Sequence, residues 1–183
     1  MRKNLDRLYK FSGFLAAVSL LAIMAIVFAQ VVLNILDFIS IKLLNKSYGF
    51  LIPSYASFSG YALGFSTFLA LGLGFRHAAH IRVTLVESML KPAAQRWTLS
   101  LVALLGVLMG CLFTWGLGQV SYESWLWGDT ASGLIRVPIW IPQSVLTVGA
   151  LIFTIAALDT LIEMLRDGHS SALKVIEPTK EQM

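Results

Sequence analysis

The chain has 183 residues, of which 57% are hydrophobic and only 13% are charged, and its formal net charge is +4. Soluble domains are typically about 45 to 50% apolar and about 25% charged, so this composition excludes an ordinary soluble domain. Cys111 is the only cysteine, which excludes an intrachain disulfide, a paired-cysteine redox motif and a cysteine cage for zinc.

Four long apolar segments follow one another along the chain. A helix needs roughly 20 apolar residues to cross a hydrocarbon core of about 30 Å, and each segment is long enough. The first segment exceeds the roughly 7 to 15 apolar residues of a signal peptide, so we expect it to be retained. We therefore predict an all-α integral membrane protein with four transmembrane helices, over residues 14–36, 55–75, 98–120 and 137–161.

The distribution of Lys and Arg predicts the orientation of these helices. Eleven of the 14 lie before the first span, between the second and third spans, or after the fourth, and three lie in the other two gaps. Because positive residues concentrate on the cytoplasmic side, both termini are predicted to be cytoplasmic. We expect one membrane domain over residues 1–165, followed by a polar, disordered cytoplasmic tail over residues 166–183.

The gap between spans two and three contains an amphipathic pattern. Ile81 and Leu85 recur at helical spacing, with Arg82 and Lys91 among the apolar positions. This pattern predicts a surface helix that lies along the inner face of the membrane and contacts lipids. Pro92 suits the first turn of the helix that follows, where a missing amide proton has no cost.

Aromatic residues gather between spans three and four. Tyr122, Trp125 and Trp127 fall in residues 121–136, which we predict to be an outer loop. Aromatic rings with one polar group favour the boundary between membrane and water. These residues are therefore predicted to form an outer aromatic belt.

Small and polar residues within the spans are candidates for helix packing. Gly60 and Gly64, and likewise Gly106 and Gly110, are spaced so that two backbones can approach closely, although glycine is also common in membrane helices that make no such contact. Gln30 and Asn34 lie one turn apart in span one and need hydrogen-bond partners. We interpret this pair as structural rather than ligand-binding.

The sequence contains no pattern typical of an active site. His77, His80 and His169 all lie outside the spans, which argues against haem held across a helical bundle. Asp159 falls in the last turn of span four, before Glu163 and Arg166, and we interpret it as part of a solvated helix end. No nucleophile elbow or phosphate loop is present. We predict no catalytic, cofactor-binding or metal-binding residues and no nucleic-acid partner.

Two motifs resemble the small permease subunits of TRAP transporters, the DctQ-like or SiaQ-like family. Residues 68–83 read FLALGLGFRHAAHIRV, and this resembles the end of that family's second span. Residues 133–142 read GLIRVPIWIP, which is similar to the family's entry into span four, and Gln30 followed by Val31 is a third match. The chain departs from the family pattern at Asn34 and in a longer first outer loop.

The resemblance implies a small subunit in the bacterial inner membrane that packs against a large permease subunit. A periplasmic binding protein would deliver an organic acid, such as a C4-dicarboxylate or sialic acid, for sodium-coupled uptake. The alternatives are a small four-helix membrane enzyme, a free-standing channel and an assembly factor. The candidate contacts with partners or lipids are Gly60, Gly64, Gly106, Gly110, Arg76, His80, Arg82, Gln30 and Asn34.

Overall fold

The computed structural model describes residues 2–77 and 92–167 of the chain, and this part contains four α-helices. They are α1 (Arg2–Leu44), α2 (Tyr55–Arg76), α4 (Pro92–Trp127) and α5 (Trp140–Asp167). All four are long and apolar enough to cross a membrane. The predicted all-α class with four spans is therefore confirmed. The predicted surface helix and most of the predicted tail lie outside the described residues.

The helices are longer than the apolar segments that identify them. α1 has 43 residues and begins twelve positions before the predicted span, because the polar residues at its start continue the helix beyond the apolar part. α4 begins at Pro92 as predicted but runs to Trp127. Tyr122, Trp125 and Trp127 therefore lie on the last turns of α4, and the prediction that they occupy a loop is wrong.

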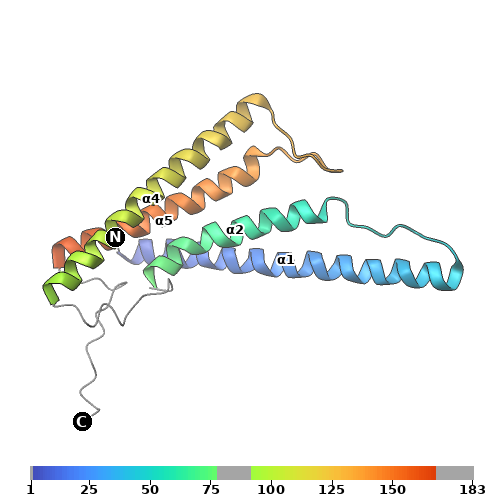
Figure 1. Cartoon of the computed structure of the whole chain (residues 1–183), viewed down its shortest axis with the longest axis horizontal. Coiled ribbons are helices and arrows are strands. Elements are labelled where there is room, and N and C mark those ends of the chain that lie inside the picture. Colours follow the sequence, from blue (N-terminus) through green and yellow to red (C-terminus); the bar gives the residue numbers. More distant parts are fainter. Residues whose placement is uncertain (1, 78–91, 168–183) are drawn as a thin grey trace, which may run out of the picture.

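The four helices lie in a row rather than in a closed bundle. α1 packs against α2, α2 against α5, and α5 against α4, while α1 and α5 touch only weakly. Figure 1 shows the hairpins α1/α2 and α4/α5 meeting at one end and diverging toward the other. We call the first the junction end. The loop end carries the two connections, residues 45–54 and 128–139.

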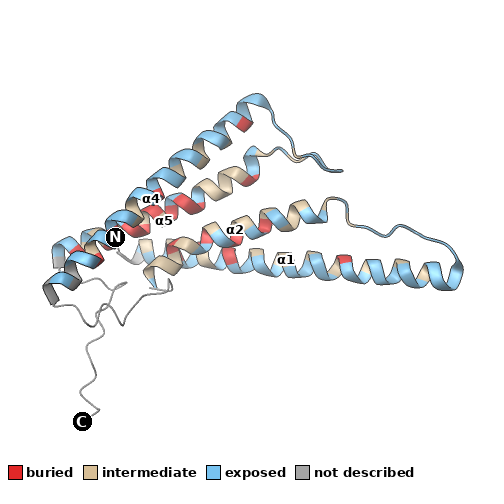
Figure 2. Ribbon diagram, viewed as in Figure 1, coloured by how far each residue is buried: buried red, intermediate tan, exposed pale blue. Residues whose placement is uncertain are grey.

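The two central helices are the best covered. In the most apolar stretch of each helix, 39% of α5 and 28% of α2 is buried, against 11% of α1 and of α4. Figure 2 shows the buried positions gathered on α5 and near the junction end, with α1 exposed along most of its length. The described chain is thus a single layer whose two outermost helices are each covered on one side.

Glycine and hydroxyl groups shape the loop end. Gly128 has a φ of 68°, the left-handed conformation that commonly ends an α-helix, and α4 stops immediately before it. Ser54 precedes α2, and its Oγ accepts a hydrogen bond of 3.1 Å from the backbone N–H of Ile135. This contact joins the two connections to each other.

Candidate functional site

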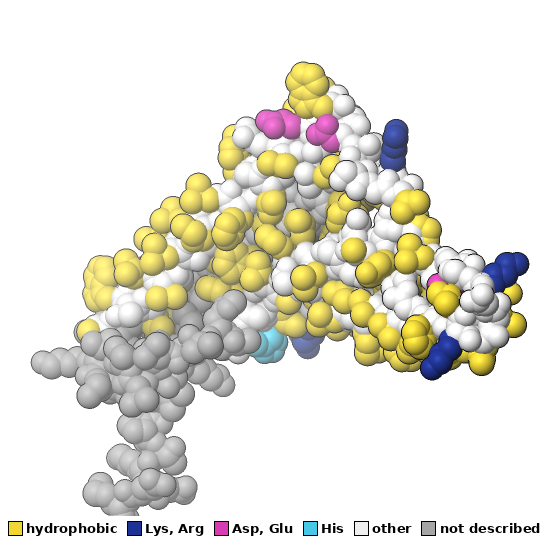
Figure 3. All heavy atoms as spheres, turned by 45° about the vertical axis from the view of Figure 1, so that its right-hand side comes forward, with side chains coloured by type: hydrophobic (Ala, Val, Ile, Leu, Met, Phe, Trp, Pro, Cys, Tyr) yellow, Lys and Arg dark blue, Asp and Glu magenta, His cyan; other side chains and the backbone are white. Residues whose placement is uncertain are grey.

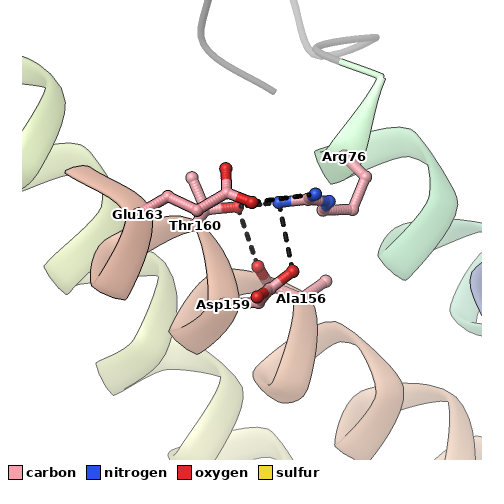
Figure 4. A network of polar contacts seen from close by, with 5 residues as sticks. All are labelled: Arg76, Ala156, Asp159, Thr160 and Glu163. Atoms are coloured by element: carbon pink, nitrogen blue, oxygen red, sulfur yellow. Dashed lines mark hydrogen bonds and ion pairs between the residues drawn. The ribbon is translucent and has the colours of Figure 1, made fainter. Parts of the chain in front are cut away.

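A cluster of charged side chains joins α2 to α5 at the junction end. Arg76 is the last residue of α2, and its Nη1 lies 3.2 Å from Oδ2 of Asp159. Its Nη2 lies 3.2 Å from Oε1 of Glu163. Between them, Oγ1 of Thr160 accepts a hydrogen bond of 3.5 Å from Nη1 (Figure 4). Asp159 and Glu163 are four residues apart on α5, so both carboxylates lie on the face toward Arg76.

The charge cluster is largely shielded from its surroundings. The exposed fractions are 8% for the side chain of Arg76, 21% for Asp159 and 11% for Glu163. Tyr9 of α1, itself 1% exposed, places its ring 5.9 Å from the guanidinium carbon. This distance permits an attractive cation–π contact. Three helices therefore meet at a single guanidinium group.

The sequence-based interpretation of Asp159 as part of a solvated helix end is wrong. Glu163 lies 87 residues from Arg76 in the sequence, and no local pattern indicates that the two would meet. They meet because α2 and α5 run in the same direction, which brings their C-terminal ends to one level (Figure 1). Arg76 was a candidate for contact with a partner or lipid, and the structure places its side chain among groups of its own chain.

Close approach of backbones defines the contact between α2 and α5. A Cβ added at Gly149 would lie 2.8 Å from the backbone carbon of Phe68, and one at Gly72 would lie 2.7 Å from Cγ2 of Ile152. Neither glycine belongs to a pair spaced four residues apart, so the small-residue pattern in the sequence does not indicate them. Gly64 and Gly72 are eight residues apart, about two helical turns, so they lie on the same face of α2. This spacing is the sequence signal that indicates the close contact between α2 and α5, which we call the α2–α5 seam.

The four predicted glycines differ in their surroundings. A Cβ at Gly64 would lie 3.1 Å from Leu146, and one at Gly110 would lie 2.6 Å from Thr154 Oγ1, so both face α5. Gly106 lies against Phe75 and Ala157 at ordinary contact distance, whereas nothing lies within 4 Å of a Cβ at Gly60. Of the four, Gly60 has the open surface that another molecule can reach.

Gln30 and Asn34 bind each other and the first connection rather than another helix. Nε2 of Gln30 donates to Oδ1 of Asn34 at 2.9 Å, and its Oε1 accepts from the backbone N–H of Ile52 at 2.9 Å. Gln30 is 3% exposed. His80 and Arg82, the remaining candidates, lie outside the described residues.

The comparison with known families decides the identity of the chain. A family model described as "Tripartite ATP-independent periplasmic transporters, DctQ component" matches residues 23–167. The chain belongs to this family. The family resemblance predicted from residues 68–83 and 133–142 is confirmed. No match was found among curated proteins or among solved structures.

Membership of the DctQ family bears on the site in two ways. The family is a transporter component and not an enzyme family, so the charge cluster is best interpreted as structural. The matched region holds Arg76, Asp159 and Glu163 together with both glycines of the α2–α5 seam, whereas Tyr9 lies before it. Among residues 2–77 and 92–167, no group of three His, Cys, Asp or Glu side chains is arranged to hold a metal ion.

The loop end of the α4/α5 hairpin carries an open groove. It has a volume of about 410 Å³ and is lined by residues of both helices, among them Tyr122, Trp125 and Trp140. The Oγ of Ser121 donates to the backbone carbonyl of Trp140 at 3.2 Å, and Thr114 and Thr154 share a hydrogen bond of 3.1 Å. The hydroxyl groups therefore hold the two helices together beside an apolar surface.

Proposed function

We propose that this chain is the small membrane subunit that braces the large permease subunit of a TRAP transporter in the bacterial inner membrane. The complete transporter takes up an organic acid, such as a C4-dicarboxylate or sialic acid, together with sodium. A periplasmic binding protein delivers that acid. This chain contributes packing surface, while the residues that bind the acid and the sodium ion belong to the other subunits.

The observation that carries this proposal is the single layer of helices. α1 and α4 each have one covered side, and their remaining surfaces present large apolar side chains. On α1, Leu20, Met24 and Phe28 follow one another at four-residue spacing and are 56%, 64% and 69% exposed. Such a face suits burial against lipid or against another membrane subunit. A row with two broad apolar faces supports the role of a wall beside a larger protein.

The central contacts support a rigid wall. At Gly149 the backbone of α2 lies against α5, and at Gly72 a side chain of α5 lies against α2. Helices packed this closely cannot slide past each other without displacing neighbouring atoms. The charge cluster adds ion pairs at one end of the same contact. A subunit held in this way is suited to stay fixed while a carrier moves beside it.

The orientation follows from the charge distribution. With eleven Lys and Arg residues on one side and three on the other, the junction end is assigned to the cytoplasm and the loop end to the periplasm. Cysteines that replace Lys46 and Gly128 in a Cys111→Ser background should react with a membrane-impermeant reagent in intact cells. Protection of both, with labelling only after lysis, would reverse the assignment.

Reconstitution tests the bracing function directly. Vesicles that contain the large subunit, supplied with binding protein and a sodium gradient, should accumulate the organic acid only when this chain is present. Cysteines at Met24 or Phe28 should also cross-link to the large subunit, whereas a cysteine at Ala16, which is 4% exposed, should not. Uptake at full rate without this chain would refute the proposal.

A further inference from the structure

The open groove between α4 and α5 continues into a second hollow along the same two helices. The second hollow has a volume of about 470 Å³, and its lining includes Cys111 and Trp115. Gly118 and Tyr122 line both hollows, so the two adjoin. We call them together the α4/α5 groove. Each hollow is as large as an ordinary small-molecule site in a protein.

The α4/α5 groove is about as deep as one leaflet of a membrane. Its lining on α4 extends from Cys111 to Trp125, and fourteen residues of helix rise about 21 Å. Half the thickness of a bilayer, headgroups included, is about 20 to 22 Å. Tyr122, Trp125 and Trp140 lie at the loop end, and their amphipathic rings favour the boundary between membrane and water. With these rings at the boundary, the groove ends near the middle of the bilayer.

Toward the junction end, α4 and α5 close together. A Cβ at Gly110 would lie 2.6 Å from Oγ1 of Thr154, and Leu99 and Ala103 further along α4 are 2% and 0% exposed. Between Gly110 and Ser124, by contrast, no residue of α4 is fully buried. The contact is therefore open over one leaflet and closed over the other. A spanning helix of another protein would follow the hairpin through both leaflets, whereas a lipid chain occupies only one.

The hydroxyl groups of the α4/α5 groove are already engaged within the chain. Oγ of Ser144, for example, donates to the backbone carbonyl of Ile141 at 2.7 Å. A carboxylate entering the groove would have to compete for these donors. The groove therefore suits hydrocarbon better than a polar ligand. The serine and threonine residues that line it and make such bonds are Ser121, Ser144, Thr147, Thr114 and Thr154.

Charges of both signs lie at the loop end of the groove. Between Gln119 and Ile139 the charged residues are Glu123, Asp129 and Arg136, and all three are exposed. Figure 3 shows magenta and dark blue side chains near the top of the molecule, around the loop end of α4 and α5, above a broad yellow surface. This arrangement offers a cation to a phosphate group and carboxylates to an ammonium group. The excess of negative charge disfavours an anionic headgroup.

We propose that the α4/α5 groove binds one acyl chain of a zwitterionic phospholipid from the leaflet at the loop end. The chain lies along α4 and α5 from the aromatic rings down to Gly110, and the headgroup lies beside the connection over residues 128–139. Gly118 provides room for it, because a Cβ there would lie 3.7 Å from Cγ2 of Thr147 and a larger side chain would extend into the groove. The inference concerns this chain alone and goes beyond the bracing function.

Lipid retention by the purified full-length chain tests the site. Extracted in mild detergent, washed and measured by native mass spectrometry, the chain should keep one phospholipid molecule. Gly118→Leu fills the groove and should lower retention by about tenfold. Gly116→Leu is the matched control, because Gly116 lies outside the lining and a Cβ there meets nothing within 4 Å. This control variant should keep the lipid.

Fluorescence quenching tests the same site without filling it. Trp140 of the groove and Trp97, which is 80% exposed near the junction end, are each kept in turn as the single tryptophan, with phenylalanine at the other four positions. Phosphatidylethanolamine with brominated acyl chains should quench Trp140 at a low mole fraction and then saturate. Quenching of Trp97 should rise in proportion to the brominated lipid, because that ring meets bulk lipid.

The headgroup preference is measured in the same assay. Brominated phosphatidylglycerol should be about threefold less effective than phosphatidylethanolamine at Trp140, because its headgroup is anionic. Glu123→Gln combined with Asp129→Asn should remove that difference. Equal quenching of Trp140 by the two lipids in the unchanged chain would contradict the zwitterionic headgroup.

Several other outcomes would overturn the inference. They are equal retention by Gly118→Leu and the unchanged chain, an equal loss in Gly116→Leu, and quenching of Trp140 that does not saturate. A cysteine that replaces Gly118 in a Cys111→Ser background should not cross-link to the large subunit in the purified complex. A cross-link would assign the groove to that subunit instead of a lipid. Failure of the chain to purify with the large subunit would refute the bracing function and leave lipid retention unchanged.

Discussion

α5 and α1 are both apolar helices, yet α5 packs against its own chain on two sides and α1 on only one. Small residues line the contacts of α5 with both neighbours. Gly149 of α5 and Gly72 of α2 lie in one contact, and Thr154 of α5 and Gly110 of α4 lie in the other. α1 packs closely through Tyr9, Ser12 and Ala16 near the junction end and exposes large side chains beyond them. Lipid is as apolar as leucine, so close backbone approach and polar contacts decide which helices associate.

The junction end brings together polar contacts that join α1 to α2 and α2 to α5. Ser12 Oγ donates to the backbone carbonyl of Leu69, and Arg76 joins α2 to α5. Changes there should destabilise the chain, while changes on the exposed faces of α1 and α4 should act on its partners instead.

Arg76→Ala should have the largest effect. It removes the guanidinium group that pairs with two largely buried carboxylates, and breaking a buried pair in this way costs roughly 3 kcal/mol. The free energy of unfolding, measured by titration with denaturing detergent and followed by the fluorescence of the five tryptophans, should fall by about that amount. Arg76→Lys should lower the free energy of unfolding by a smaller amount than Arg76→Ala. Lysine keeps the charge but loses the planar fork that reaches both carboxylates.

Arg166→Ala is the matched control for this prediction. Arg166 is exposed in the last turn of α5, close to the charge cluster in sequence. Its removal should change the free energy of unfolding by less than about 1 kcal/mol. If the two alanine variants unfold alike, the charge cluster does not hold the junction end together.

Gly149→Ala should have the second largest effect on the free energy of unfolding, and Gly60→Ala is its matched comparison. A methyl group at Gly149 meets the backbone of Phe68, which cannot turn aside as a side chain can, so the expected cost is about 1 to 3 kcal/mol. At Gly60 the methyl group meets nothing within 4 Å, and alanine should stabilise the helix by up to about 1 kcal/mol. In the same assay, Gly149→Ala should lower the free energy of unfolding and Gly60→Ala should raise it. Equal losses in both variants would contradict the close contact between α2 and α5 at Gly149.

The number and class of the helices could be predicted from hydropathy because the bilayer imposes a minimum apolar length on each span. The ends of α1 and α4 could not, since polar residues such as Arg7 or Ser121 continue a helix once it has left the core. The contact of Arg76 with Glu163 depends on the parallel alignment of α2 and α5, and that alignment has no signature in either segment. For the same reason, Gly60 and Gly64 look alike in the sequence and differ in the fold.

Asp159→Asn should have the smallest effect of the three, although it changes a charged group of the same cluster. Arg76 faces two carboxylates, so loss of one charge leaves a matched pair with Glu163, and the asparagine oxygen can still accept from Nη1. The free energy of unfolding should change by no more than about 1 kcal/mol, the size of an ordinary hydrogen bond.

The sign of this effect should reverse when Arg76 is absent. In an Arg76→Ala background the guanidinium group no longer offsets the repulsion between the two carboxylates, so Asp159→Asn should restore part of the lost stability rather than reduce it further. A double variant that is less stable than Arg76→Ala alone would show that Asp159 stabilises the junction end through a partner other than Arg76. Recovery in the double variant would establish that the guanidinium group is what allows two negative side chains to lie buried on one face of α5.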